Sequence, residues 1–440
     1  MKKLLRHRKG SFFWLVVASV FFRLQLEFAY TSFVSPLYYY AGFASIENPD
    51  KYIESWLLFS AGLMTLSGRT KRPSDYIILF GFFCFLTPLL VFYGEADANR
   101  PALYFVLLQY LLMVAFRSKF VIRTPTISNG DSSLKSISIA GIIIATIWML
   151  ASVGVTNFSL DIETVYEFRE NANNSIYTGP MGYLVAWVTS VCSAVLLMQC
   201  LRDKKYFLCL GIGLLHVFWF GITTHKSVLF YPIQVACIYA VLRSTKSSAA
   251  IPLGLSVVVL ISQVMFELTE SIVLSSLFVR RIFFVPSHLT FTYFEFFENN
   301  PMVYWSNSFM SWINKYPYNE STALVIGNYL NDPTLWANNS FFATGYMHAG
   351  LVGVTIYGVV AGIILSILDS YSRNGTPIWM VVSVTIVPFY TLFTSADLTT
   401  TLLTHGLGFG MLVLAFMNGK ASPKMKPAEN FGVQGPQGTP

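Results

Sequence analysis

The chain has 440 residues, of which 54% are hydrophobic and only 12% are charged. A soluble globular protein carries about 25% charged residues, so half that share cannot cover the surface of a water-soluble fold of this length. Composition therefore excludes a soluble enzyme, a disordered protein and a disulfide scaffold, and the net charge of +7 is informative only through its distribution. We expect an all-α polytopic membrane protein.

The membrane spans follow from the apolar runs, because a bilayer core about 30 Å thick is crossed by about 20 helical residues. The basic start MKKLLRHRKG precedes the first run without a small-residue cleavage site, which predicts a retained signal-anchor. The weakest run contains Glu54. We expect about twelve transmembrane helices, at residues 12–34, 52–67, 76–93, 101–116, 136–153, 180–201, 206–222, 227–242, 249–267, 343–368, 377–394 and 401–417.

The basic residues predict the orientation of these spans through the positive-inside rule. With the N-terminus in the cytoplasm and the spans alternating, the cytoplasmic segments hold 21 Lys and Arg residues and the opposite side holds 7. We therefore expect both termini to be cytoplasmic and the two longest connections to be external.

These two external connections, 154–179 and 268–342, are too long to be simple turns. The second is rich in aromatic residues and should fold as short helices near the membrane surface, with Tyr304, Trp305, Trp312 and Tyr316 at interface depth. The chain is accordingly divided into helices 1 to 9 with the first loop (1–267), the large external loop (268–342), helices 10 to 12 (343–417) and a disordered cytoplasmic tail (418–440).

The positive-inside rule disfavours basic residues on the outer side, so those found there need a reason, and two of them are adjacent. Arg280 and Arg281 can flank one anion, since guanidinium groups bind the oxygens of phosphate or pyrophosphate in a bidentate manner. The alternative is that they pair with Glu267, Glu270 or lipid headgroups.

Three further basic side chains are candidates for substrate binding. Arg169 lies in the first long loop, where it either joins a cleft shared with the second loop or pairs with Glu167 and Glu170. His225 and Lys226 occupy a short connector at the outer membrane boundary, within reach of a lipid phosphate. Snorkelling of the lysine to the interface is the alternative explanation.

Removal of a proton from an attacking hydroxyl group requires a carboxylate or a neutral imidazole on the outer side. His348, where the last external segment enters the membrane, and Glu295 fit this role best, whereas His216 and His405 lie in apolar spans and are expected to be structural. The remaining external candidates are Glu298, Glu320, Asp332 and His288. Arg23 and Glu27, four residues apart within the first span, are expected to pair with each other.

Several motifs are missing from the sequence. It has no Gly-rich phosphate loop, no acidic DxD-like cluster and no His/Cys metal spacing, and its five cysteines lie in apolar runs. These gaps argue against an ATP-driven transporter and a nucleotide-sugar transferase, and we expect neither a metal, nor a cofactor, nor nucleic acid.

Two stretches carry a resemblance to a known family. RRIFFVPSHLTFTYFEFFENNP resembles the start of the large periplasmic loop of bacterial oligosaccharide repeat-unit polymerases, the Wzy or O-antigen polymerase family. ANNSFFATGYMHAGLVG resembles the stretch with which these polymerases and the related O-antigen ligases re-enter the membrane, although the His-Asn pair of the ligases is Asn338-Asn339 here.

The resemblance implies a GT-C-like, metal-independent glycosyltransferase in the bacterial inner membrane with a periplasmic active site. Its donor would be an undecaprenyl pyrophosphate-linked glycan and its acceptor a second lipid-linked repeat unit. Membrane lipids and a chain-length regulator protein are the other implied partners. Tyr293 and Asn338, which lie in the two matching stretches, join the candidate glycan-binding residues.

Two other functions remain open. A lipid-linked oligosaccharide flippase or other secondary transporter would carry charges near the bilayer midplane and show related halves, neither of which the sequence displays. An O-antigen ligase, which moves finished polymer onto a lipid A core, is the nearest enzymatic alternative.

Overall fold

The structure is a computed structural model, and its description covers residues 2–117, 119–122, 130–154, 158–159 and 175–417. Helices fill it, and the described residues contain no β-strand. The first half of the chain contributes α1 (Lys2–Ala29), η1 (Tyr30–Val34), α2 (Ser35–Tyr38), η2 (Tyr39–Ala41), α3 (Pro49–Leu63), α4 (Pro73–Gly81), η3 (Phe82–Leu86), α5 (Thr87–Glu95), α6 (Arg100–Phe116), α7 (Gly130–Val153), α9 (Gly179–Trp187), η4 (Val188–Cys192) and α10 (Ser193–Arg202).

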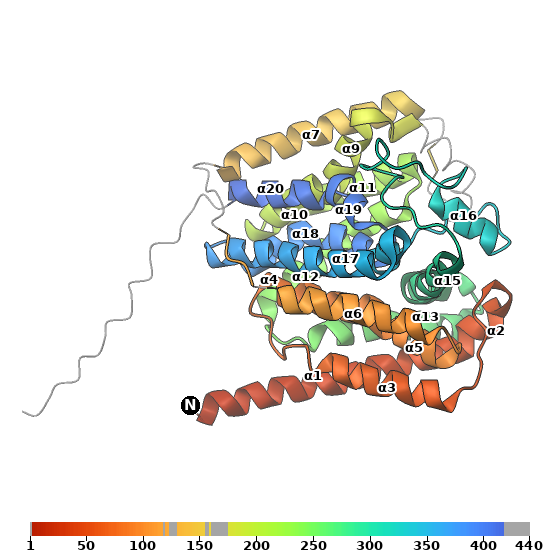
Figure 1. Ribbon diagram of the computed structural model, residues 1–440. Coiled ribbons are helices and arrows are strands. Elements are labelled where there is room, and N and C mark those ends of the chain that lie inside the picture. Colours follow the sequence, from red (N-terminus) through yellow and green to blue (C-terminus); the bar gives the residue numbers. More distant parts are fainter. Residues whose placement is uncertain (1, 118, 123–129, 155–157, 160–174, 418–440) are drawn as a thin grey trace, which may run out of the picture.

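The second half completes the bundle (Figure 1). It contributes α11 (Tyr206–Thr223), α12 (Lys226–Ser244), α13 (Ala250–Thr269), α14 (Ile272–Ser275), η5 (Ser276–Phe284), α15 (Val285–Asn299), α16 (Thr322–Tyr329), α17 (Phe341–Arg373), α18 (Ile378–Thr394), α19 (Leu398–Leu403) and α20 (Leu407–Met417).

Ten continuous helical stretches within the described residues are long and apolar enough to cross a membrane, and α6 and α18 are shorter apolar helices. The protein is therefore an all-α, multi-pass membrane protein, as its composition predicts. The ten long helices together with α6 and α18 differ from the twelve expected spans at two places. Pro49–Leu63 is not among the ten, whereas Ile272–Asn299 is.

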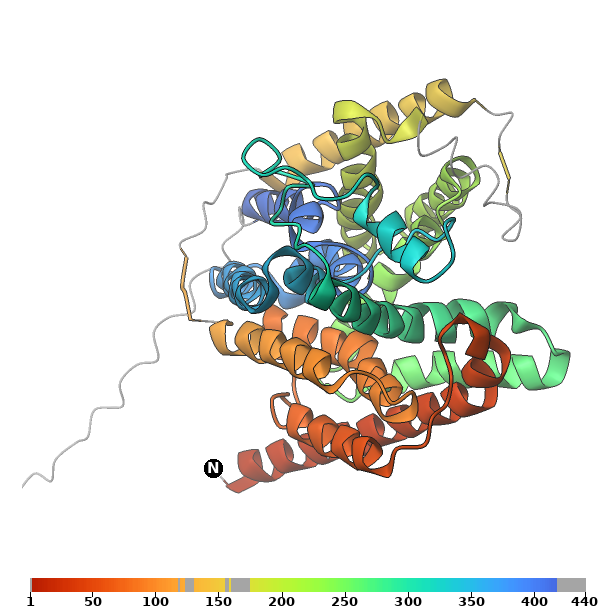
Figure 2. The same cartoon turned by 45° about the vertical axis from the view of Figure 1, so that its right-hand side comes forward.

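The large loop thus begins with a helix of 28 residues, formed by α14, η5 and α15, and the expectation that it contains only short helices is wrong. This stretch does not run alongside the bundle. Figure 1 shows α15 nearly end-on while α1, α6 and α17 lie lengthwise, and the turned view of Figure 2 shows its length. Its apolar residues face other helices, since Phe283, Phe284, Phe291 and Phe294 are buried.

The central helices pack closely because small residues line their contacts. A Cβ atom added to Gly358 of α17 would lie 2.8 Å from the carbonyl oxygen of Gln109, and one added to Gly362 would lie 2.9 Å from that of Met113. These glycines, four residues apart, let α17 approach the backbone of α6, as small residues do at helix contacts in membranes.

A buried ion pair fastens the first helix to the third. Arg23, which is fully buried, donates from Nε to Glu27 at 2.9 Å and from Nη1 to the carbonyl oxygen of Ser55 at 2.8 Å. Its guanidinium carbon lies 4.1 Å from the ring centroid of Trp56. The predicted pairing of Arg23 with Glu27 is confirmed, and the pair holds α1 against α3.

One end of the bundle collects the basic connections. The backbone N–H of Thr70 donates to the carbonyl oxygen of Lys246 at 3.0 Å, and Arg117 lies 3.4 Å from the Asp75 carboxylate. We call this end, formed by residues 68–75, 117, 119–122, 243–248 and 369–376, the basic end. The loop end, at the other end of α17, carries residues 300–348 and 395–405.

Candidate functional site

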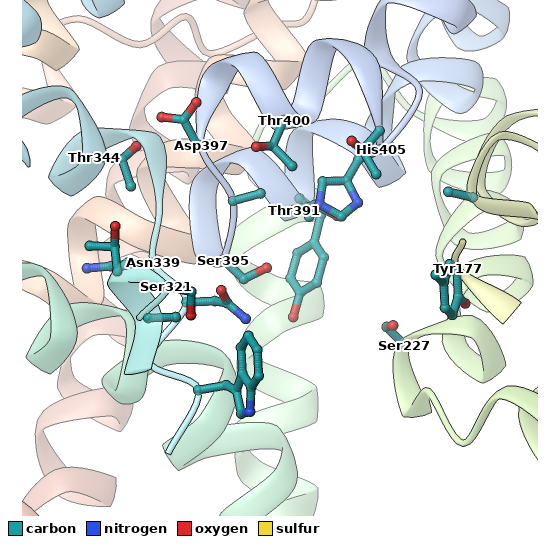
Figure 3. A pocket seen from close by; sticks show the side chains of 18 of the residues that line it. Tyr177, Ser227, Ser321, Asn339, Thr344, Thr391, Ser395, Asp397, Thr400 and His405 are labelled. Atoms are coloured by element: carbon teal, nitrogen blue, oxygen red, sulfur yellow. The ribbon is translucent and has the colours of Figure 1, made fainter. Parts of the chain in front are cut away.

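A cavity of about 870 Å³ lies at the loop end of the bundle (Figure 3). Its walls come from η4, α12, α18 and α19, from the first turns of α17, and from the segment before α17. The hydroxyl groups that line it belong to Thr189, Ser190, Ser227, Ser306, Ser321, Thr322, Thr344, Thr391, Ser395, Thr400 and Thr404.

Aromatic and amide side chains complete the lining. They are Tyr177, Tyr231, Tyr293, Tyr316, Tyr390, Trp336, Asn307, Asn338 and Asn339. Asp397 is the acidic lining residue, His225 and His405 are the basic ones, and no lysine or arginine of the described residues takes part. Burial raises the pKa of Tyr316, so this phenol stays neutral. The lining combines many neutral polar groups with a larger apolar surface, and Asp397 is its acidic residue.

Asp397 sits between α18 and α19 and has all its acceptor positions occupied. Oδ1 accepts from Nε2 of His348 at 3.2 Å and from the hydroxyl of Tyr357 at 2.7 Å. Oδ2 accepts from the backbone N–H of Thr399 at 2.9 Å and from the Thr399 hydroxyl. Through the first of these bonds Asp397 caps the N-terminus of α19. Burial raises the pKa of Asp397, but hydrogen bonds from His348, Thr399 and Tyr357 outweigh burial and lower it.

His348 is held on both ring nitrogens. Its Nδ1 accepts from the backbone N–H of Trp305 at 3.1 Å, so in the neutral ring Nε2 carries the proton and donates to Asp397. The Trp305 indole stacks on the imidazole with ring centroids 4.9 Å apart and donates from Nε1 to the hydroxyl of Tyr357 at 2.9 Å. His348 therefore offers no free nitrogen to a substrate, contrary to the expectation that it is an available base.

The same contacts change the expected position of Trp305. Its indole, expected at the membrane interface, is half-buried against His348, whereas Trp312 is 81% exposed. Tyr304 and Trp305 both have positive φ, 48° and 56°, which is uncommon for non-glycine residues. Three hydrogen bonds to α17 hold this strained turn, two to His348 and one to Tyr357.

α17 is kinked directly after His348. Ala349 departs from helical geometry, and Gly350 has φ +56° and ψ −134°, a combination that essentially only glycine adopts. The kink separates the first eight residues of α17 from the part that packs along α6.

Three predicted site residues line the cavity, and five of those described, His348 among them, do not. His225, Tyr293 and Asn338 are lining residues. Arg280 lies with its guanidinium carbon 4.1 Å from the ring centroid of Tyr38 and donates to the hydroxyl of Ser276. Arg281 and Glu295 have exposed side chains and are not lining residues either.

Lys226 follows His225 as the first residue of α12 but is not itself a lining residue. Arg169 and most of the first long loop lie outside the described residues, as does the expected tail 418–440. In the described part of the chain, no three His, Cys, Asp or Glu side chains gather as a metal site requires.

Sequence reasoning missed Asp397 and interpreted His405 as a structural residue of a span. Asp397 stands in TSADLTT, between two apolar runs, where an aspartate followed two residues later by threonine is a helix N-cap pattern. That pattern, on the outer side of the predicted topology, was the available signal. His405 follows on the same side in LLTHGLG, and its Gly406 has φ +84°, which marks a turn rather than the interior of a span.

Comparison with known proteins identifies no relative: no protein-family model matches the chain, and no curated protein or solved structure is similar to it.

Proposed function

We propose that this protein is an O-antigen (surface polysaccharide) polymerase. It would transfer a glycan from undecaprenyl pyrophosphate onto a second lipid-linked repeat unit at the periplasmic face of the inner membrane. The observation that carries the proposal is the cavity at the loop end, which is bordered by eleven hydroxyl side chains, five tyrosines and three asparagines.

The lining suits a sugar chain. Sugar hydroxyls both donate and accept, as do the serine, threonine and tyrosine hydroxyls and the asparagine amides of the wall. Aromatic rings cover the apolar faces of sugar rings. Ligand pockets span about 300–1,000 Å³, so 870 Å³ leaves room for more than one sugar unit.

The location of the cavity supports a periplasmic reaction. The cavity lies at the loop end, and the basic connections lie at the other end of the bundle. The positive-inside rule assigns basic connections to the cytoplasm. Lipid-linked glycans presented in the outer leaflet would then reach the cavity from the side where polymer is assembled.

His405 is the proposed proton acceptor, since both nitrogens of His348 are engaged. It borders the cavity at the end of α19, where its backbone N–H donates to Thr400 at 3.1 Å and its carbonyl oxygen accepts from Ser190 at 3.3 Å (Figure 3). The acceptor hydroxyl would bond to the anomeric carbon and give its proton to the imidazole. The bond from that carbon to the lipid pyrophosphate breaks, and the pyrophosphate leaves with the electron pair.

The leaving pyrophosphate needs positive charge nearby. Among the lining residues, His225, which precedes α12, would supply it in its protonated form, with Lys226 next in the chain. Figure 3 places Tyr177 and Ser227 across the cavity from Asp397 and Thr344. We therefore assign the pyrophosphate to the His225 side and the glycan to the side of α17 and α19.

The test is polymerisation by purified protein with a defined undecaprenyl pyrophosphate-linked repeat unit. A ladder of lipid-linked products supports a polymerase. Transfer only onto a lipid A core would indicate a ligase, and movement of the substrate across vesicles without elongation would indicate a transporter; either result would refute the proposal.

Variants test the assigned base. His405→Gln should abolish elongation, whereas His216→Gln should retain it, because His216 is buried in α11 against Trp219 and is not a lining residue. The folded fraction of both proteins is measured by size-exclusion chromatography. Normal elongation by folded His405→Gln would remove this residue from the mechanism.

A further inference from the structure

Three polar side chains around the first turns of α17 have no hydrogen-bond partner for part of their polar surface. They are the Nδ2 group of Asn339, the hydroxyl of Ser340 and the hydroxyl of Thr344. Their side chains are 2%, 0% and 5% exposed. Folded proteins satisfy the large majority of buried polar groups, so three unpartnered groups within six residues require an explanation.

The local geometry keeps these groups unpartnered. Oδ1 of Asn339 accepts from the backbone N–H of Ser340 at 2.7 Å. This bond fixes the orientation of the carboxamide, and its NH₂ group has no acceptor. Ser340 is the N-cap residue of α17, but its side chain makes no capping bond. The first N–H groups of a helix lack acceptors within the helix, so donors accumulate at this point.

Asn339 and Thr344 border the cavity, and Figure 3 places them on the same side as Asp397. Asp397 cannot serve them, because its oxygens are already occupied by His348, Tyr357 and Thr399. The wall therefore contains one closed network and, beside it, one group of open donors.

We propose that Asn339 and Thr344, which border the cavity on either side of Ser340 in the chain, form a subsite that binds an oxygen atom of an uncharged sugar. The subsite lies in the cavity of the proposed function and names its substrate class, a neutral glycan. A helix N-terminus alone would also accept an anion. Here the ionised Asp397 lies in the same wall without a lysine or arginine among the described lining residues, which disfavours an acidic sugar.

The proposal predicts an unusual combination of effects. Thr344→Val keeps the shape of the side chain and removes a buried hydroxyl that has no partner, so the ligand-free protein should become more stable. The same change should weaken glycan binding about tenfold. A hydroxyl with a purely structural role would give the opposite sign for stability.

Ser383→Ala provides the matched control. The Ser383 hydroxyl, on α18, is also buried and unpartnered, but Ser383 is not a lining residue of the cavity. Ser383→Ala should stabilise the ligand-free protein and leave glycan binding unchanged.

The experiment measures binding and thermal unfolding of wild type, Asn339→Ala, Thr344→Val and Ser383→Ala in detergent. Three probes are used: undecaprenyl pyrophosphate bearing a neutral trisaccharide, the same lipid with one hexose replaced by a hexuronic acid, and the lipid without sugar. We expect wild type to bind the lipid with the neutral trisaccharide most tightly. Asn339→Ala and Thr344→Val should each bind this probe about tenfold more weakly and bind the other two probes as wild type does.

Equal losses for the sugar-free lipid would mean that the subsite binds the pyrophosphate, and unchanged binding by both variants would mean that no subsite exists; each result overturns the inference. Preference for the acidic probe would also overturn it. Elongation by wild type is recorded in parallel. If wild type does not elongate but binds the neutral probe, and Thr344→Val weakens that binding, the proposed polymerase function is refuted and the subsite stands.

Discussion

Replacing Asp397 by Ala tests whether its carboxylate organises the cavity wall. The change removes the N-cap of α19, which costs about 1 kcal/mol. It also leaves the Tyr357 hydroxyl, donating at 2.7 Å, and Nε2 of His348, at 3.2 Å, without an acceptor in a buried position. Each buried unpartnered donor costs about 1–3 kcal/mol. We expect the free energy of unfolding to fall by on the order of 4 kcal/mol.

The assay is reversible denaturant unfolding in detergent, followed by circular dichroism. Asp332→Ala is a matched control, because Asp332 accepts from the backbone N–H of Thr334 at 3.1 Å and from its hydroxyl at 2.7 Å in the same Asp-X-Thr pattern. Asp332 is exposed, so its loss should cost less than about 1 kcal/mol.

A double-mutant cycle with Tyr357→Phe then isolates the Tyr357–Asp397 hydrogen bond. Since the two groups are in contact and both contact His348, a coupling of about 1 kcal/mol or more is expected. If Asp397→Ala were no more destabilising than Asp332→Ala, the carboxylate would not organise the wall, and the reasoning would be refuted.

Three further outcomes follow from the structure. Folding lowers the pKa of Asp397, so its contribution to stability is complete above its unfolded pKa of about 3.9. This contribution is lost as the pH falls through the folded pKa. The difference in free energy of unfolding between wild type and Asp397→Asn should therefore shrink during acid titration. Gly358→Ala should destabilise by about 2 kcal/mol because its Cβ would meet the Gln109 carbonyl, whereas Gly211→Ala, with open space around it, should not, as thermal unfolding of both will show. Trp305→Phe, which loses the indole N–H bond to Tyr357, should speed amide hydrogen exchange at residues 303–307.

The fold class could be predicted from the sequence because apolar runs and their length directly report helices in a membrane. The sequence did not predict the continuous helix Ile272–Asn299. Ile272–Asn299, which carries two arginines and two glutamates, was expected as part of an external loop of short helices. Its phenylalanines are instead buried against α5, α6 and α17, and such tertiary contacts leave no periodic signal in one sequence.

The site was predicted only in part, for a similar reason. Tyr293 and Asn338 line the cavity because the large loop does fold over it. Arg280 instead packs on Tyr38, which is 242 positions away in the chain, and a contact of that separation cannot be read from one sequence. Asp397 has partners 40 and 49 residues away, so its sequence context reveals only its local role as a helix cap.

The polar groups around the cavity therefore divide into two kinds, with opposite consequences when they are removed. Asp397, His348, Tyr357 and Trp305 satisfy one another, so removal of any of them leaves a buried group unpartnered and should lower stability. Thr344 has no such partner, so its removal should raise stability and weaken ligand binding. The first set gives the wall a fixed shape, and the second keeps free donors in it. A cavity that binds a flexible glycan needs both, because a rigid wall limits the ordering cost of binding and free donors supply its specificity.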